Sequence, residues 1–485
     1  MRSFRASRRQ FLAGSLGGSF AALRPRPARA APGRGKLRAG AATSNITPRL
    51  GCSMAGGMTD RIAVEVHDEL HVRALALDNG RTRLAIAVAD SCAVPREIFD
   101  RAKQMISEQG SIPISNILLS ATHTHTAPAA AHLFQSRPDP KYQDFLALRI
   151  ADAVLLAVHR LEPARIGWGV GREPRLVFNR RYFMKPGTIP PNPFGGIDRV
   201  QMNPRPGSPD IVKAAGATDP EVGVLAIESL DGRPIAVLGS YALHYVGGEG
   251  PGQISADYFA VWARSLARLA GLDRGWRFPP FVAMLGNACS GNINGVNFLQ
   301  PPQKHPPYEQ MQRYADVLAA ESYRTWREIE FQDAVELGAS IEELNLGVRL
   351  PNSADVVAAR KLLADAGPGP YQQRPQIYAR ETLLLSEGYP KTAQTFVQAL
   401  RIGSLGIATF PGEAFVEMGL EVKAKSPFQP TFLIELANDY RGYIPTVENH
   451  ELGGYETWRA KSSYLETHAA PKLVAAALRQ LSRLA

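Results

Sequence analysis

The chain has 485 residues, of which 45% are hydrophobic and 21% charged, so it can bury a large core. A disordered chain, a coiled coil and a mini-protein are therefore excluded. The formal net charge is +10, but residues 1–30 hold seven arginines and no acidic residue, which leaves +3 for the rest. Phosphate binding needs a strongly basic face, so nucleic acid is not an expected partner.

The N-terminal segment resembles an export signal of the twin-arginine type. The sequence SRRQFL at 7–12 precedes an apolar run that ends at Leu23, and Ala28-Arg29-Ala30 offers a cleavage site. The apolar run of 13 residues is too short to cross a bilayer, which takes about 20. We expect residues 1–30 to be a signal peptide for export to the periplasm or the exterior. A basic tail that stays inside the cell is the alternative.

The first half of the remaining chain alternates strands with helices. Asp78-Asn79-Gly80 is a strong turn signal between two apolar runs and predicts a hairpin. The expected strands are Leu37–Ile46, Leu70–Leu77, Arg83–Ala89 and Asn116–Ser120, and the expected helices are Pro95–Gln109 and Tyr142–Leu161.

A loop-rich segment, Arg172–Asp219, separates these elements from a second hairpin turned by Asp231-Gly232. The strands expected after it are Val222–Glu228, Ile235–Leu243, Phe281–Leu285, Val335–Leu346, Gln394–Phe410 and Thr431–Leu436. The helices expected there are Asp257–Leu269, Tyr308–Ile329, Ser353–Ala366, Tyr378–Glu387 and a terminal helix from Pro471.

This mixed order predicts an α/β fold of the layered kind, with β-sheets covered by helices in one large domain over residues 31–485. Hairpins among helical segments argue against a strict eightfold βα alternation.

Three cysteines lie far apart, at Cys52, Cys92 and Cys289, and none belongs to a CxxC pair. Neither a disulfide framework nor a thiolate zinc site is indicated. One disulfide, Cys92 with Cys289, is allowed, but three small buried apolar residues are the favoured interpretation.

The segment LLSATHTHTAP at 118–128 holds two histidines, His123 and His125, just past a predicted buried strand. In an extended chain residues two apart face the same side, so the two imidazoles could bind a metal, or one could bind it and the other act as a base. Histidines satisfied in the core explain the pair equally well on these residues alone.

Seven stretches in a fixed order resemble the catalytic domain of the neutral, non-lysosomal ceramidases, especially their short bacterial relatives. The resemblance covers about residues 39–457. The stretches are SATHTHTAP (120–128), FNR (178–180), YALHY (241–245), SAD (255–257), GNACSGNIN (286–294), PGE (411–413) and LANDYRGYIPTVENHELGGYET (436–457).

The resemblance implies a zinc ion held by His123, His244, Glu413 and Tyr443. Imidazole nitrogens and a carboxylate oxygen are suitable ligands for Zn²⁺. Spacing alone does not separate Tyr443 from Tyr440. Tyr443 is chosen because the tyrosine twelve positions further on then matches the second active-site tyrosine of the family.

The resemblance further implies metal-assisted hydrolysis, in which zinc-bound hydroxide attacks the carbonyl of an N-acyl amide. His125 would orient that water or carry its proton, and Arg180 and Tyr455 would donate to the developing oxyanion. A loop-bracing arginine and an ordinary packed tyrosine are the alternatives for these two donors. Asp257 and Asn438 are expected to brace the site rather than react.

The sequence also departs from the family. Where the ceramidases carry GDxSPN, this chain has Asn292 in place of the aspartate and Asn294 in place of the serine, so both are expected at the substrate. Ser290 lacks the GxSxG context that would activate it as a nucleophile. Tyr245 replaces the usual proline after the second histidine, and the chain ends soon after Tyr455.

The leading hypothesis is an exported, zinc-dependent, ceramidase-like hydrolase of an amide, with a lipid or small-molecule amide as substrate. No transmembrane segment is expected in the mature chain, and transient contact with a membrane surface is compatible with such a substrate. An amidohydrolase-type (β/α)₈ metal hydrolase of another amide or ester is the second reading. A non-catalytic, metal-binding exported protein is the third.

Overall fold

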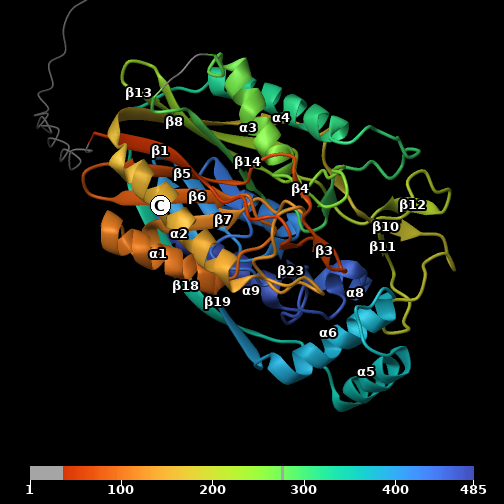
Figure 1. Ribbon diagram of the computed structural model, residues 1–485. Coiled ribbons are helices and arrows are strands. Elements are labelled where there is room, and N and C mark those ends of the chain that lie inside the picture. The colour runs from red at the N-terminus through yellow and green to blue at the C-terminus, as the bar shows by residue number, and fades with distance from the viewer. Residues whose placement is uncertain (1–35, 275–277) are drawn as a thin grey trace, which may run out of the picture. The chain divides into compact units, whose positions relative to one another are not determined.

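Two β-sheets lie face to face in the protein, and helices cover their outer faces (Figure 1). The computed structural model describes residues 36–274 and 278–485, and residues 35–485 form one compact unit. The signal peptide expected at 1–30 lies outside the described residues.

The larger sheet has eight strands among the described residues, in the order β16-β14-β13-β8-β1-β5-β6-β7. The pairs β14–β16 and β6–β7 are parallel, and the others are antiparallel. In chain order its strands are β1 (Arg38–Asn45), β5 (His71–Asp78), β6 (Arg83–Ala89), β7 (Ile117–Ala121), β8 (Glu162–Arg172), β13 (Glu221–Ser229), β14 (Pro234–Tyr241) and β16 (Val282–Asn287).

The smaller of the two sheets has the order β18-β19-β20-β22, with β20 and β22 parallel. Its strands are β18 (Leu337–Gly347), β19 (Thr392–Ile402), β20 (Leu405–Thr409) and β22 (Thr431–Ile434).

One apolar core fills the space between the sheets. Leu400 and Ile402 of β19 pack in this core with Leu75 and Leu77 of β5, whereas Ala399 packs in the core on the opposite side of its sheet. The middle of β5, residues 74–77, is apolar on both faces, as is expected of a strand covered on both sides, whereas β19 also buries the polar side chains of Thr395 and Gln398.

Helices complete the layers on both sides. The helices α1 (Arg96–Gly110) and α2 (Pro140–His159) pack on β1, β5 and β6, and α3 (Asp257–Leu269) and α4 (Glu309–Arg327) pack on β13, β14 and β16. The helices α7 (Val416–Lys425) and α9 (Ala469–Leu484) cover the smaller sheet. The architecture is therefore a layered α/β fold, as the sequence predicts.

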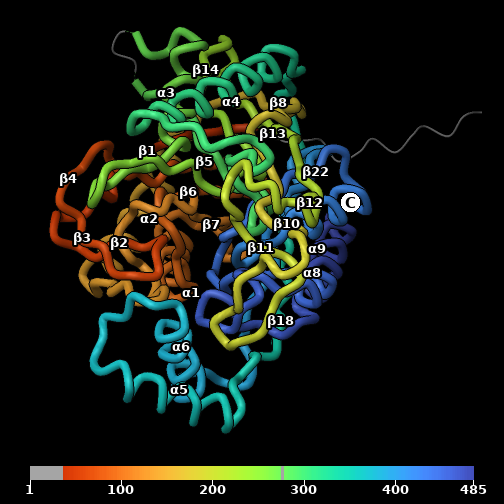
Figure 2. Tube along the Cα trace, turned by 90° about the vertical axis from the view of Figure 1, so that its right-hand side faces the viewer, coloured from red at the N-terminus to blue at the C-terminus, as the bar shows by residue number. Residues whose placement is uncertain are grey.

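A helical hairpin, α5 (Ser353–Ala366) and α6 (Arg374–Gly388), is inserted between β18 and β19. Figures 1 and 2 both show this pair standing apart from the two sheets. The side chain of Asn352 accepts from the backbone of Asp355, and the Asp355 side chain caps Asn352 in return, which fixes where α5 begins.

Short elements in the loops complete the chain. They are β2 (Ser53–Met54), β3 (Arg61–Ile62), β4 (Glu65–Val66), β9 (Phe178–Asn179), β10 (Arg181–Met184), β11 (Gln201–Met202), β12 (Ile211–Ala214), β15 (Gln253–Ile254), β17 (Ile293–Asn294), β21 (Glu413–Ala414), β23 (Tyr443–Ile444), α8 (Val447–Leu452) and the 3₁₀ turns Ile114–Asn116 and Tyr455–Thr457.

Three expectations from the sequence need correction. The segment expected as loop, 172–219, contains the small sheet β11-β10-β12. The strand expected over Gln394–Phe410 is wrong in its extent, because Gly403, with φ 60°, turns it into the β19–β20 hairpin. The helix α7 was not expected, because its apolar positions follow the PGE motif without a clear capping residue.

Both main sheets are open and do not close into a barrel, which excludes the (β/α)₈ fold of the amidohydrolase hypothesis. Cys52, Cys92 and Cys289 are all free, so the allowed disulfide does not form. Across the described residues, none of the helices combines the length and apolar character needed to cross a bilayer.

Candidate metal centre

The predicted ligands lie where the carboxyl ends of parallel strands from both sheets meet. His123 follows β7, His244 follows β14, and Glu413 follows β20. The loops after β16 and β22 reach the same place, since an isolated bridge joins Ser120 at the end of β7 to Ala437 after β22. Ligand sites in open α/β sheets form at such strand ends, because neighbouring connections diverge there.

Three donor atoms converge in this place. The Nε2 atom of His123 lies 3.1 Å from Nε2 of His244 and 3.2 Å from Oε2 of Glu413, and the His244 and Glu413 atoms are 3.6 Å apart. All three side chains are almost fully buried. Two ligands of one tetrahedral zinc ion lie about 3.3 Å apart when the bonds are about 2.0 Å long, so the spacing suits a single ion.

Backbone carbonyls set the tautomers of both imidazoles. Nδ1 of His123 donates to the carbonyl oxygen of Cys92 at 2.6 Å, and Nδ1 of His244 donates to that of Ser290 at 3.1 Å. Each neutral ring therefore presents a bare Nε2 lone pair to Glu413, whose Oε2 has no hydrogen-bond partner among the described residues. Three lone pairs facing one another in a buried site require a cation, and this donor set fits zinc.

The pKa values of His123 and Glu413 are shifted by their mutual contact. Burial opposes the charged form of His123, but the Glu413 carboxylate outweighs burial and raises the pKa of His123 well above its usual value. Burial favours protonated Glu413, yet His123 and a hydrogen bond from Tyr440 hold the pKa of Glu413 below its usual value. The carboxylate stays ionised, so a proton and a metal ion compete for the same place.

A second set of donor atoms lies beside the first. Atoms of Cys92, His123 and His125 are within 4.8 Å of one another. Sγ of Cys92 is 3.9 Å from Nδ1 of His123, but that nitrogen already donates to the Cys92 carbonyl. The ring therefore offers only Nε2 to an ion, which favours the set with His244 and Glu413.

His123 and His125 do face each other, but not for the expected reason. His123 has φ 72°, in the left-handed region, so the segment is not extended there. Nε2 of His125 still lies 3.2 Å from Nε2 of His123. Burial, followed by the charges of His123, Arg61 and Arg180, holds the pKa of His125 well below its usual value, so this imidazole stays neutral.

Tyr245 holds the ring of His125. The two rings stack with centroids 3.7 Å apart and planes inclined by 20°. Tyr245 stands where the ceramidases carry proline, so the residue that departs from the motif supplies a contact that sequence reasoning missed.

Both predicted tyrosines lie at the site. Glu413 and Tyr443 are direct partners in the parallel pair β21–β23, which places the two residues side by side. The ring of Tyr455 is 5.7 Å from that of Tyr443, edge to face. Burial raises the pKa values of both phenols above their usual value, so each keeps its proton in the absence of a metal.

Tyr440 has a different contact. Its hydroxyl donates to Oε1 of Glu413 at 2.7 Å. The hydrogen bond leaves Oε2 as the oxygen directed at the two imidazoles. Tyr440 thus positions the carboxylate, a role that the spacing of the two tyrosines in the sequence does not reveal.

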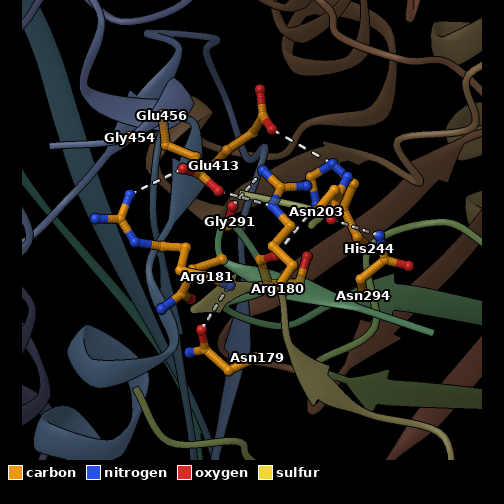
Figure 3. A network of polar contacts seen from close by, with 12 residues as sticks. Asn179, Arg180, Arg181, Asn203, His244, Gly291, Asn294, Glu413, Gly454 and Glu456 are labelled. Carbon is orange, nitrogen blue, oxygen red and sulfur yellow. Dashed lines mark hydrogen bonds and ion pairs between the residues drawn. The ribbon is translucent and has the colours of Figure 1, made fainter. Parts of the chain in front are cut away.

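A buried carboxylate fixes Arg180. Nε of Arg180 donates to Oε1 of Glu456, Nη1 of Arg181 donates to Oε2 of the same carboxylate, and both distances are 2.8 Å (Figure 3). A further hydrogen bond runs from Nη2 of Arg180 to the carbonyl oxygen of Gly291. Burial opposes the charge, but Tyr443 and Glu456 outweigh it and raise the pKa of Arg180. The Arg180 guanidinium is therefore a fixed cation. Its contacts with Glu456 and the Gly291 carbonyl were not predicted from the sequence.

The two asparagines expected at the substrate lie elsewhere. Asn292 is fully buried, its amide donates to Glu417, and its side-chain oxygen accepts from the backbone of Val416. Asn294 donates to the side chain of Asn203 at 3.3 Å. Neither side chain lines the cavity that opens onto the donor cluster, whereas Asn203 does, so we assign neither asparagine a direct contact with the substrate. Asn292 instead supports Arg180, whose backbone nitrogen donates to its carbonyl oxygen.

Asp257 and Asn438 make the bracing contacts that were expected. Asp257 accepts hydrogen bonds from the backbone of Val246 and Gly247, just after His244. The side chain of Asn438 accepts from the backbone of Leu119 in β7, ahead of His123. Each thereby holds the loop of one histidine.

A buried carboxyl group supports the loop on the far side of His244. Oε1 of Glu435 accepts from the hydroxyl of Ser290 at 2.6 Å and from its backbone nitrogen at 3.1 Å. The same loop provides the carbonyl oxygens that hold His244 and Arg180. Glu435 therefore positions two site residues without touching the donor cluster.

A cavity of about 310 Å³ opens onto the cluster. His123, Glu413 and Tyr443 lie at its wall, together with Arg180 and Tyr455. The apolar residues of the wall are Met58, Leu133, Phe134, Ile189, Pro190, Pro191, Val200, Met202 and Trp458. His244 lies behind the wall and reaches the cluster from the interior.

Comparison with known proteins agrees with this fold. No protein-family model matches the chain. A solved structure of a ceramidase complexed with C2 is similar over 93% of this chain and 75% of its own, with 17% identity and a TM-score of 0.70. The neutral ceramidase from Pseudomonas aeruginosa is similar over 92% and 75%, with 19% identity and a TM-score of 0.66. The chain therefore has a neutral ceramidase-like fold, as the motifs predict.

Replacing Glu435 with Gln tests the support of the loop at Ser290. Burial raises the pKa of Glu435 well above its usual 4.5, so the folded state binds more protons than the unfolded state. The contribution of Glu435 to the stability of the wild type should therefore fall as pH rises above about 4.5, and Glu435→Gln removes this contribution. Thermal denaturation should give a melting temperature difference, variant minus wild type, that becomes more positive from pH 4.5 to 8.

The matched variant Glu435→Ala leaves two buried donors of Ser290 without an acceptor. Each unsatisfied donor costs about 1 to 3 kcal/mol, so this variant should be less stable than Glu435→Gln at every pH. A melting temperature difference that does not change with pH, or equal stabilities of the two variants, would contradict the assigned role.

Proposed function

We propose that the protein is a zinc-dependent hydrolase of an amide bond, ceramidase-like in its chemistry. The observation that carries this proposal is the convergence of three unpaired lone pairs, from His123, His244 and Glu413, at the wall of a cavity. The ceramidase-like fold supports an amide as the bond that is broken.

The residues that would hold the ion are His123, His244, Glu413 and Tyr443. Tyr443 is included because it is the strand partner of Glu413 and lines the cavity. A bound zinc ion polarises a carbonyl oxygen and lowers the pKa of a coordinated water to about 7.

His125 would accept the proton of the attacking water. Its imidazole is neutral, its Nε2 faces the donor cluster, and the stacked ring of Tyr245 fixes its orientation. A neutral base within hydrogen-bond reach of the water is what general-base catalysis needs.

Arg180 and Tyr455 would stabilise the negative charge that develops on the carbonyl oxygen. Glu456 and Gly291 hold the guanidinium, and burial keeps the Tyr455 phenol protonated, so both groups can donate hydrogen bonds. Donors fixed in advance cost little reorganisation when the charge appears, which is why such groups lower the barrier.

No serine nucleophile is part of this scheme. The hydroxyl of Ser290 donates to Glu435, its side chain is fully buried, and it does not line the cavity. Water is therefore the proposed nucleophile. The apolar part of the wall suits the acyl chain of an N-acyl lipid, and such a substrate would bring the protein into transient contact with a membrane surface.

The proposed location is outside the cytoplasm, in the periplasm or secreted. This part rests on the twin-arginine sequence at 7–12 and the apolar run that follows it. Residues 31–485 would then be the mature enzyme.

A non-catalytic, exported metal-binding protein is the second candidate function. The replacement of the aspartate and serine of the ceramidase motif by Asn292 and Asn294 favours it. Hydrolysis of a panel of N-acyl amides, with and without a chelator, separates the two candidates. Turnover that is lost on chelation and restored by zinc supports the hydrolase, whereas bound zinc without turnover of any amide or ester supports the binder.

Removing one histidine of the cluster should lower zinc content and activity together. His123→Ala and His244→Ala should each reduce bound zinc to well below one ion per chain, because each variant loses one of the proposed ligands. Metal analysis of the purified proteins measures this directly. His159→Ala, at the exposed end of α2, is the control and should keep its zinc. Unchanged zinc in both cluster variants would refute the ligand assignment.

Replacing Tyr455 with Phe should slow turnover without loss of metal. The variant removes a hydroxyl donor to the reacting centre and keeps the ring contact with Tyr443, so kcat should fall by about 10²-fold while zinc content stays at the wild-type level. Tyr323→Phe, on α4, is the matched control and should keep full activity. Full activity in Tyr455→Phe would remove this residue from the mechanism.

A further inference from the structure

One cation at the cavity has no side-chain partner among the residues that the structure describes. The cavity is lined by two arginines, Arg180 and Arg374, and by two acidic residues, Asp198 and Glu413. Arg374 is exposed and is the first residue of α6, the second helix of the inserted hairpin.

The other three charged groups are already engaged. Arg180 pairs with Glu456, and Glu413 faces the two imidazoles. Asp198 accepts from the indole nitrogen of Trp458 at 2.7 Å and from the amide of Asn192 at 3.1 Å. The side chain of Arg374, by contrast, makes no ion pair or hydrogen bond with any described residue.

Neighbouring arginines of the same hairpin are paired. Arg360 bonds to Glu387 at 2.9 Å, and Arg380 bonds to Glu381 at 3.1 Å and to the carbonyl oxygen of Phe134. Within the hairpin, the arginine without a partner is therefore the one that lines the cavity. The start of α6, where Gln373 provides no side-chain cap, adds positive potential at the same place.

We propose that Arg374 is a subsite for an anionic group of the substrate, a carboxylate or a phosphate, distant from the bond that is broken. This inference rests on the proposed function and narrows it from N-acyl amides in general to amphiphilic amides with an anionic group. A guanidinium offers a planar set of donors that binds carboxylate or phosphate through two parallel hydrogen bonds.

The balance of charges at the cavity supports a substrate with an anionic group. Arg180 and Arg181 share the single carboxylate of Glu456, so that group carries a net positive charge. Arg374 adds a second positive charge, which Asp198 offsets because its partners, Trp458 and Asn192, are neutral. A divalent metal ion, compensated in part by Glu413, would keep the balance positive, which attracts anionic substrates and disfavours cationic ones.

Binding of ligands that resist hydrolysis tests the subsite without depending on turnover. We suggest three dodecanesulfonamides whose N-substituent is a hexyl chain ending in a carboxylate, a phosphate or a hydroxyl group. Dissociation constants would be measured for the full-length protein and for Arg374→Gln, Arg374→Glu and the control Arg360→Gln.

The wild type and Arg360→Gln should bind at least one anionic ligand about fivefold more tightly than the hydroxyl ligand, an advantage of about 1 kcal/mol for one partly exposed ion pair. Arg374→Gln should abolish this preference and Arg374→Glu should reverse it. The preference should also weaken as ionic strength rises. The carboxylate and phosphate ligands show which anion the subsite takes.

The same preference in wild type and Arg374→Gln, or no binding of any of the three ligands, would overturn the proposal. Failure of the wild type to hydrolyse any amide, with the anionic preference intact, would refute the proposed function and leave the subsite standing. Hydrolysis of neutral amides without any effect of Arg374→Gln on the preference would refute the subsite alone.

Discussion

The structure depends on the burial of the Glu413 carboxylate against two imidazole rings that, in their neutral form, present only lone pairs to it. The carbonyls of Cys92 and Ser290 take the Nδ1 hydrogens of His123 and His244, which leaves both Nε2 lone pairs directed at the carboxylate. Without a cation this arrangement costs free energy, because buried lone pairs repel and have lost their water. The fold accepts that cost at the place where strands of both sheets end.

A ring of supporting groups makes the arrangement rigid. Glu435 holds the loop that carries the Ser290 carbonyl, Glu456 holds Arg180, and Tyr440 sets which oxygen of Glu413 faces inward. None of these three groups is a proposed ligand of the ion. Each nevertheless fixes the position of a residue that would bind the ion or the substrate. Such supporting contacts explain why charged side chains are buried around the cavity.

Local sequence patterns predicted most strands and helices, as in the hairpin of β5 and β6, where two apolar runs flank the turn Asp78-Asn79-Gly80. His123 and His244 are 121 positions apart, so no local pattern could join them, and the resemblance of motifs did so. Buried pairs such as Glu456 with Arg181 stayed invisible, since charged residues predict an exposed surface. The left-handed backbone at His123 was equally hidden, because a positive φ is uncommon for any residue other than glycine.

X-ray absorption at the zinc edge, on full-length protein produced in zinc-replete medium, tests the account most directly. We predict one zinc per chain with only nitrogen and oxygen neighbours at about 2.0 to 2.2 Å, and with the outer-shell scattering of two imidazole rings. Protein without zinc, or a sulfur neighbour at about 2.3 Å from Cys92, would contradict the proposed centre.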